Sequence, residues 1–144
     1  MSAPRVDQVN VVLTDLAAAT QFLGELGFEL PPAPPRWEAH HRALPAASEF
    51  EIELDSAVFA QEWGGLPPSF NGVVLNLRVD ERAEVDALHE RAVALGGRSL
   101  RAPYDAFWGS RFAVVEGPGP IVLGLLSPRD IEHAGEPPDP TTLA

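Results

Sequence analysis

Residues 72–128 decide the fold of this chain, and they read GVVLNLRVDERAEVDALHERAVALGGRSLRAPYDAFWGSRFAVVEGPGPIVLGLLSP. The segment starts with a strand pattern at 73–79, where side chains expected to face a helix alternate with side chains that face away. After Asp80 a helix is predicted, and it ends at the glycine pair 96–97. Three further strands are predicted, at about residues 98–101, 111–116 and 121–126. The predicted order is therefore β-α-β-β-β.

The first half of the chain repeats this order. Residues 8–13 alternate as a half-buried strand, with Gln8 and Asn10 on one face. Asp15 stands where it can cap a helix that ends at Gly27, just as Asp80 precedes the second helix. Three more strands are predicted, at residues 28–30, 37–44 and 49–55. A repeat of this kind predicts two similar modules.

The strand at 49–55 has two chemically distinct faces. Phe50, Ile52 and Leu54 form the apolar face, and the other face carries the carboxylates Glu49, Glu51, Glu53 and Asp55. Like charges on one strand face repel one another. We therefore expect this face to meet water or a cationic partner.

Length and charge restrict the class of protein. The chain has 144 residues, no cysteine and a formal net charge of −11. Such a charge argues against partners rich in phosphate, so neither nucleic acid nor a membrane surface is expected as a partner. No apolar run reaches the length of a membrane span, and no signal sequence is seen at the N-terminus. We expect a cytoplasmic protein without disulfides.

The two modules are expected to form one domain over residues 1–128. The boundaries are module 1 at about 5–56, a crossover at 57–71 with a short helix bearing Val58, Phe59 and Trp63, and module 2 at about 72–128. The segment 129–144 is polar and rich in proline, and it is predicted to be a loose arm.

Four stretches carry a resemblance to a known family: VNVVLTDLAAATQFLGELGFEL, EIELDS, VVLNLRVDERAEVDAL and PYDAFWGSRFAVVEGPGPIVLGLLSP. They resemble the vicinal oxygen chelate superfamily, which includes glyoxalase I, extradiol dioxygenases and bleomycin-resistance proteins. The resemblance implies an α+β fold in which two βαβββ modules form curved mixed sheets around a cup. It is weak for function, because one fold serves many activities.

The resemblance also implies where a metal would bind. Metal-using members place one ligand in the first strand and one in the last strand of each module. The equivalent positions here are Gln8, Glu53, Val73 or Val74, and Gly124. Valine and glycine supply no ligand atom, and a catalytic divalent metal needs three or more nitrogen or oxygen ligands. We therefore expect no metal and no other cofactor.

Two neighbouring histidines lie in the third predicted strand. His40 and His41 point to opposite faces, so only one of them is expected to face the cup. That histidine is either a surface or packing residue, or a ligand contact and proton acceptor near Glu53. His89 is expected to be solvated, and His133 lies in the C-terminal segment.

Several aromatic residues flank loops and strand starts. Trp37, Tyr104 and Phe107 are expected either to line the cup or to pack. Trp108 and Arg111 match the family's Trp-Gly-x-Arg pattern, which favours core packing for Trp108 and a structural carboxylate pair for Arg111. The full set of candidate ligand-binding residues is Gln8, Asn10, Trp37, His41, Glu53, Asn76, Tyr104, Phe107, Trp108 and Arg111.

Two functions are consistent with these features. The first is a metal-free small-molecule binding protein that resembles bleomycin-resistance proteins and holds an aromatic or cationic ligand in the cup. The second is a divergent lyase, isomerase or cyclase that uses Glu53, alone or with a divalent metal recruited through Gln8 and His41. For both functions the resemblance implies a homodimer.

Overall fold

The computed structural model describes residues 3–47 and 50–143, and one mixed sheet of seven strands dominates it. The strand order is β2-β3-β1-β4-β7-β6-β5. The strands are β1 (Arg5–Leu13), β2 (His41–Leu44), β3 (Glu51–Ser56), β4 (Gly72–Arg78), β5 (Arg98–Asp105), β6 (Arg111–Glu116) and β7 (Val122–Leu126). The helices are α1 (Leu16–Glu25), α2 (Ala57–Gly64) and α3 (Arg82–Ala94). The α+β class predicted from the sequence is confirmed.

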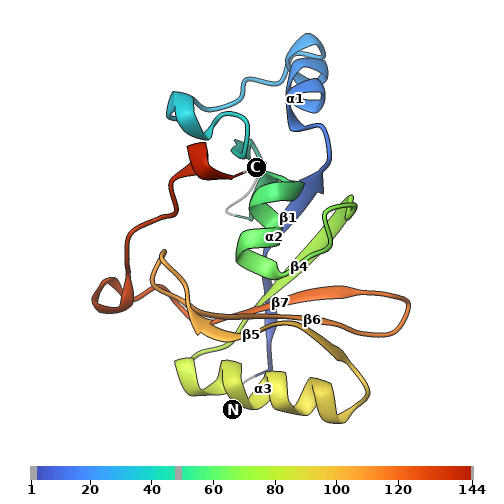
Figure 1. Ribbon diagram of the computed structural model, residues 1–144, viewed down its shortest axis with the longest axis vertical. Helices are drawn as coiled ribbons and strands as arrows, with labels where there is room; N and C mark the ends of the chain where they lie inside the picture. The colour runs from blue at the N-terminus through green and yellow to red at the C-terminus, as the bar shows by residue number, and fades with distance from the viewer. Residues whose placement is uncertain (1–2, 48–49, 144) are drawn as a thin grey trace.

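The two modules join edge to edge within one chain. Strand β1 pairs with β4 in antiparallel register, so that Asn10 lies beside Val74 and Gln8 beside Asn76. Figure 1 shows the resulting curved sheet, with α3 covering one face and α2 lying on the opposite face. Pairing the first strands of both modules places their polar residues side by side at the centre of the sheet.

The second module follows the prediction except that the strand predicted at 98–101 extends to Asp105, whereas the first module departs from it further. No strand forms at 28–30. The strand predicted at 37–44 is shortened to β2, and a 3₁₀ helix at Pro35–Trp37 precedes it in the chain. Proline cannot donate to a strand ladder, and four of the six residues at 31–36 are proline. The prediction of eight strands was therefore wrong by this one strand.

Helix α1 consequently covers little sheet. Its first residue, Leu16, is buried, and Asp15 caps it by accepting a hydrogen bond from the backbone N–H of Ala18, as predicted. Further along the helix, Phe22 is 61% exposed, and Leu26 beyond its end is 62% exposed. Figure 1 shows α1 standing apart from the rest of the molecule.

The core consists of two clusters, one on each face of the sheet. Helix α3 covers a small cluster that includes Val85 and Leu125. The larger cluster lies under α2 and includes Phe59, Trp63 and Phe112. Because α2 fills one end of the concave face, only the other end remains open.

The C-terminal segment packs on the protein instead of forming a loose arm. The backbone N–H of Asp130 donates to Gly109, that of Gly135 donates to Phe107, and Pro140 is fully buried. In Figure 1 the segment runs alongside α2 toward the 3₁₀ helix at Pro35–Trp37. The prediction of a loose arm was wrong, because proline spacing and polarity do not reveal backbone pairing with a distant loop. Among the described residues, no helix is both long and apolar enough to cross a membrane.

Candidate functional site

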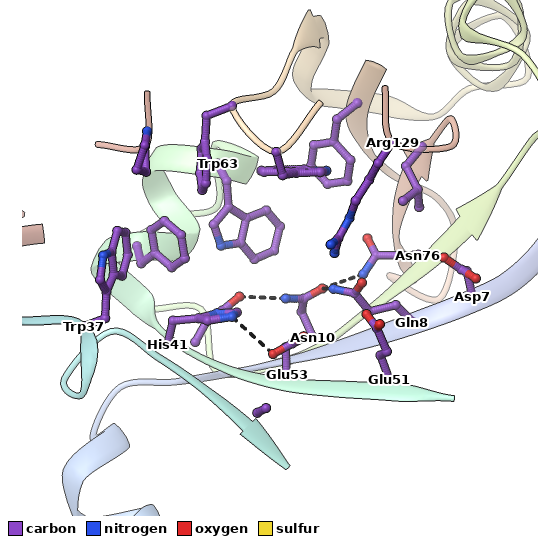
Figure 2. A pocket seen from close by; sticks show the side chains of 18 of the residues that line it. Asp7, Gln8, Asn10, Trp37, His41, Glu51, Glu53, Trp63, Asn76 and Arg129 are labelled. Carbon is purple, nitrogen blue, oxygen red and sulfur yellow. Dashed lines mark hydrogen bonds and ion pairs between the residues drawn. The ribbon is translucent and has the colours of Figure 1, made fainter. Parts of the chain in front are cut away.

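A cavity of about 860 Å³ occupies the open end of the concave face. Strands β1 to β4 supply a polar floor, aromatic residues supply a wall, and residues 31–34 and 127–129 contribute to the rim. Figure 2 shows the polar side chains below and the aromatic rings above them. This volume is typical of sites that hold a drug-sized molecule.

The acidic end of the floor is built from β2 and β3. The Nδ1 atom of His41 bonds to Asp55, and its Nε2 atom lies 3.2 Å from Glu53 Oε2 in an ion pair. Asp55 is 1% exposed, and the side chain of Glu53 is 16% exposed. The acidic strand face thus meets a cationic partner, but that partner comes from the neighbouring strand.

These contacts determine the charge of His41. Burial lowers the pKa of His41, but the hydrogen bond to Asp55 and the charges of Asp55 and Glu53 outweigh burial and raise the pKa from 6.5 to about 10. Burial raises the pKa of Asp55, and the contact with His41 opposes that rise. His41 is therefore protonated at neutral pH, and the predicted role of proton acceptor does not fit it.

Amide side chains continue the floor across the module junction. Asn10 Nδ2 donates to Asp55 Oδ2 over 2.6 Å, and Asn10 Oδ1 accepts from Asn76 Nδ2 and, over 3.1 Å, from Gln8 Nε2. Figure 2 shows this chain of contacts running from His41 to Asn76. One network therefore connects strands β2, β3, β1 and β4.

The positions of the family's metal ligands do not fit a divalent metal. Glu53 is an oxygen donor and Gln8 a weak one, but Val74 and Gly124 offer no side-chain donor. Asn76 Oδ1 fills the space in which a side chain at position 124 would start. Within residues 3–47 and 50–143, no group of three or more His, Cys, Asp or Glu side chains is arranged to hold a metal ion. The hydrogen-bonded network occupies this part of the cup.

The aromatic wall is a set of edge-to-face contacts. Trp37 meets Phe59 with ring centroids 5.0 Å apart, and Trp108 meets Phe112 at 5.2 Å. Trp63 contacts Phe112 at 6.0 Å and is 5% exposed. These interlocked rings present a fixed apolar surface to the cavity.

Most of the candidate ligand-binding residues come together in this cavity. Those that line it are Gln8, Asn10, Trp37, His41, Glu53, Asn76, Phe107 and Trp108. Tyr104 lies behind the wall, where its hydroxyl donates to the Trp63 carbonyl. Arg111 lies on the α3 side of the sheet, where it pairs with Asp86 and Asp105 as a structural residue. His40 bonds to Ser56, so His41 is the histidine of the cup.

Several residues of the cavity were not identified as candidates from the sequence, among them Asp55, Trp63 and Arg129. Asp55 shares a strand face with Glu53, and this alternation was the signal that could have found it. Trp63 carried no such signal, because its exposure to the cavity depends on how α2 docks. Arg129 reaches the rim only because the C-terminal segment folds back.

Comparisons with known proteins agree with this fold. A superfamily member from Vibrio splendidus 12B01 aligns with a TM-score of 0.56 and 16% identity, over 88% of this chain and 100% of that chain. A Mn(II)-bound glyoxalase from Novosphingobium aromaticivorans aligns with a TM-score of 0.56 and 20% identity, over 87% of this chain and 40% of that chain. At these identities the likeness shows the fold alone. None of the curated proteins compared with the chain is a match.

The sequence pattern of one family matches residues 5–125, which include both modules and the strands of the cavity. The chain belongs to the Glyoxalase/Bleomycin resistance protein/Dioxygenase superfamily.

Proposed function

We propose that this protein binds a small aromatic or cationic molecule in the cup without the help of a metal. The observation that carries this proposal is the cavity itself, in which an aromatic wall faces a hydrogen-bonded floor with a carboxylate at one end. Aromatic rings favour stacking with a planar ligand, and a cation adds attraction both to ring faces and to Glu53. Superfamily membership is compatible with this function and does not select it.

Tryptophan fluorescence tests the proposal directly. Trp37, Trp63 and Trp108 all line the cavity, so a planar ligand that enters it changes their emission. We expect saturable quenching by members of a panel of planar cationic compounds, with the same affinity in chelator and in added Mn²⁺ or Zn²⁺. Quenching that requires metal, or a panel without any micromolar binder, contradicts the proposal.

A divergent enzyme is the second candidate. The observation that favours it is the carboxylate of Glu53, which lies in the cavity beside a protonated histidine. A carboxylate next to an imidazolium forms a pair of proton acceptor and proton donor. NMR spectra of each bound compound, recorded during incubation with the wild type and with Glu53→Gln, distinguish the two functions. Conversion by the wild type alone favours the enzyme, and unchanged spectra favour the binder.

A further inference from the structure

The polarity of the floor is fixed from Asp55 outward. Asp55 accepts from His41, so its other oxygen is the acceptor for the amide nitrogen of Asn10. The side-chain oxygen of Asn10 is the atom that faces Asn76, so Asn76 turns its nitrogen toward it. Each contact determines the orientation of the next amide, and the last one leaves Asn76 Oδ1 as an acceptor.

That oxygen has no hydrogen-bond partner among the described residues. Asn76 is 2% exposed, and Asn76 Oδ1 is a buried polar atom that accepts no hydrogen bond from these residues. An orphaned buried acceptor destabilises the protein unless a ligand or water supplies a donor. Asn76 lines the cavity, and Figure 2 draws its oxygen on the side that faces Arg129. A ligand with an N–H or O–H group would therefore satisfy Asn76 Oδ1 in the floor.

The wall shows the opposite need. Trp63 Nε1 is also a buried polar atom without a hydrogen-bond partner in the described part of the chain, and Trp63 lines the same cavity. An indole nitrogen only donates, so it calls for an acceptor atom. In Figure 2 the ring of Trp63 stands above the polar floor. A ligand that satisfies both atoms carries a donor toward Asn76 Oδ1 of the floor and an acceptor toward Trp63 Nε1 of the wall.

The rim adds a positive charge to the groups that a ligand in the cavity meets. Of the cations that line the cavity, His41 is paired with Glu53 and Asp55, and Arg78 lies 3.6 Å from Asp7. Arg129 takes part in none of the ion pairs found among the residues that the structure describes, and Figure 2 shows its guanidinium pointing into the cavity. Guanidinium groups bind carboxylates through two parallel hydrogen bonds.

We propose that the ligand is a planar aromatic compound with two polar ends, an N–H group that donates to the floor at Asn76 and Glu53 and an acidic group that pairs with Arg129. This inference rests on the proposed function, and it narrows the aromatic or cationic class to compounds that also bear an anionic group. The aromatic rings hold the plane of the ligand, while the two ends determine its direction in the cup.

Three naphthalene probes separate the two ends. The first is 6-(aminomethyl)-2-naphthoate, which has both groups, the second is 2-naphthylmethylamine, and the third is 2-naphthoate. Binding is measured by equilibrium dialysis to the wild-type protein and to the variants Arg129→Gln, Asn76→Ala and Glu53→Gln. Arg91→Gln, on the exposed side of α3, is the control for a lost surface charge. Circular dichroism verifies that each variant is folded, and Glu53→Gln tests the floor if Asn76→Ala unfolds.

We expect the probe with both groups to bind wild-type protein most tightly. Arg129→Gln is expected to weaken both carboxylate probes about three- to tenfold, since the side chain is partly solvated, and to leave 2-naphthylmethylamine unchanged. Asn76→Ala and Glu53→Gln are expected to weaken the binding of both amine probes about tenfold and to leave the binding of 2-naphthoate unchanged.

The outcomes distinguish this inference from the proposed function. If 2-naphthylmethylamine binds but Arg129→Gln has no selective effect on the carboxylate probes, the inference is wrong and the proposed function stands. If none of the three probes binds wild-type protein, both are contradicted. If Arg91→Gln weakens the carboxylate probes as much as Arg129→Gln does, the effect is one of net charge and the inference is overturned.

Discussion

The side chain of Asn76 occupies the space directly over Gly124, so that a Cβ atom at position 124 would lie 2.0 Å from Asn76 Oδ1. Neighbouring strands β4 and β7 place these two residues opposite each other. Glycine at this position lets Asn76 reach Asn10 across the module junction. A side chain there and the network observed in the cup exclude each other.

We therefore expect Gly124→Ala to lower the free energy of unfolding by about 1–3 kcal/mol, because Asn76 must leave its place in a packed site. Urea denaturation measures the effect. In the double variant with Asn76→Ala, the cost of Gly124→Ala should shrink, since the clashing amide is gone. Equal costs in both backgrounds would show that the two side chains do not compete for this space.

The charge of His41 predicts how stability depends on pH. Its folded-state pKa of about 10 lies above the ordinary 6.5, so the proton is held more tightly in the folded protein. The stabilisation is fully present below pH 6.5 and is lost as the pH rises through about 10. We expect unfolding free energy to fall over this interval, and to fall less in His41→Gln. Imidazole titration by NMR provides the direct measurement, and a midpoint for His41 at or below the ordinary value would contradict the assignment.

Arg111 is expected to contribute to stability and not to ligand binding. Its guanidinium lies 2.7 Å from Asp86 and 3.3 Å from Asp105, on the face of the sheet opposite the cup. Because these groups are partly solvated, we expect Arg111→Met to cost about 1 kcal/mol or less of unfolding free energy. Affinity for any ligand of the cup should stay within error of the wild type. A selective loss of affinity would show that Arg111 does contribute to ligand binding.

The C-terminal segment is expected to stabilise the cup that it borders. Pro140 is fully buried, and Leu143 packs against the larger core cluster. A chain that ends after Pro138 loses both contacts, and we expect it to lose about 2 kcal/mol of unfolding free energy. Leu143→Ala alone should cause part of that loss, whereas Glu136→Gln, at an exposed position of the same segment, serves as a control. An unchanged urea midpoint for the truncated chain would show that this packing adds no stability.

Exposed apolar side chains on α1 and just beyond its end relate to the expected homodimer. Phe22, Leu26 and Phe28 are 61%, 62% and 43% exposed, and apolar surface of this kind is commonly covered in an assembly. We expect a dimer in sedimentation equilibrium and its conversion to a monomer by Phe22→Glu together with Leu26→Glu. Glu25→Gln, a neighbouring substitution without added charge, should leave the dimer intact. A monomeric wild type, or a dimer that tolerates both glutamates, would contradict this expectation.

The second module and the overall class were predictable because they depend on local patterns. Alternation in 73–79, the helix signals after Asp80 and the glycines at 96–97 specify their elements within a few residues of chain. The first module was harder, because prolines at 31–35 remove one strand without changing the apolar pattern around it. The departures from the family's metal ligands could also be identified from the sequence, since they need only the identities of the residues.

The sequence by itself determined the two modules, the acidic strand and the lack of donors at positions 74 and 124. Only the tertiary structure decided how these features combine. Pairing of β1 with β4 aligned Asn10 with Asn76, and pairing of β2 with β3 brought His41 to Asp55. Packing of the C-terminal segment then brought Arg129 to the rim. Hydrogen bonds and charges act over a few ångströms. Contacts between residues distant in sequence therefore depend on strand register and on where the chain folds back on itself, and local patterns specify neither.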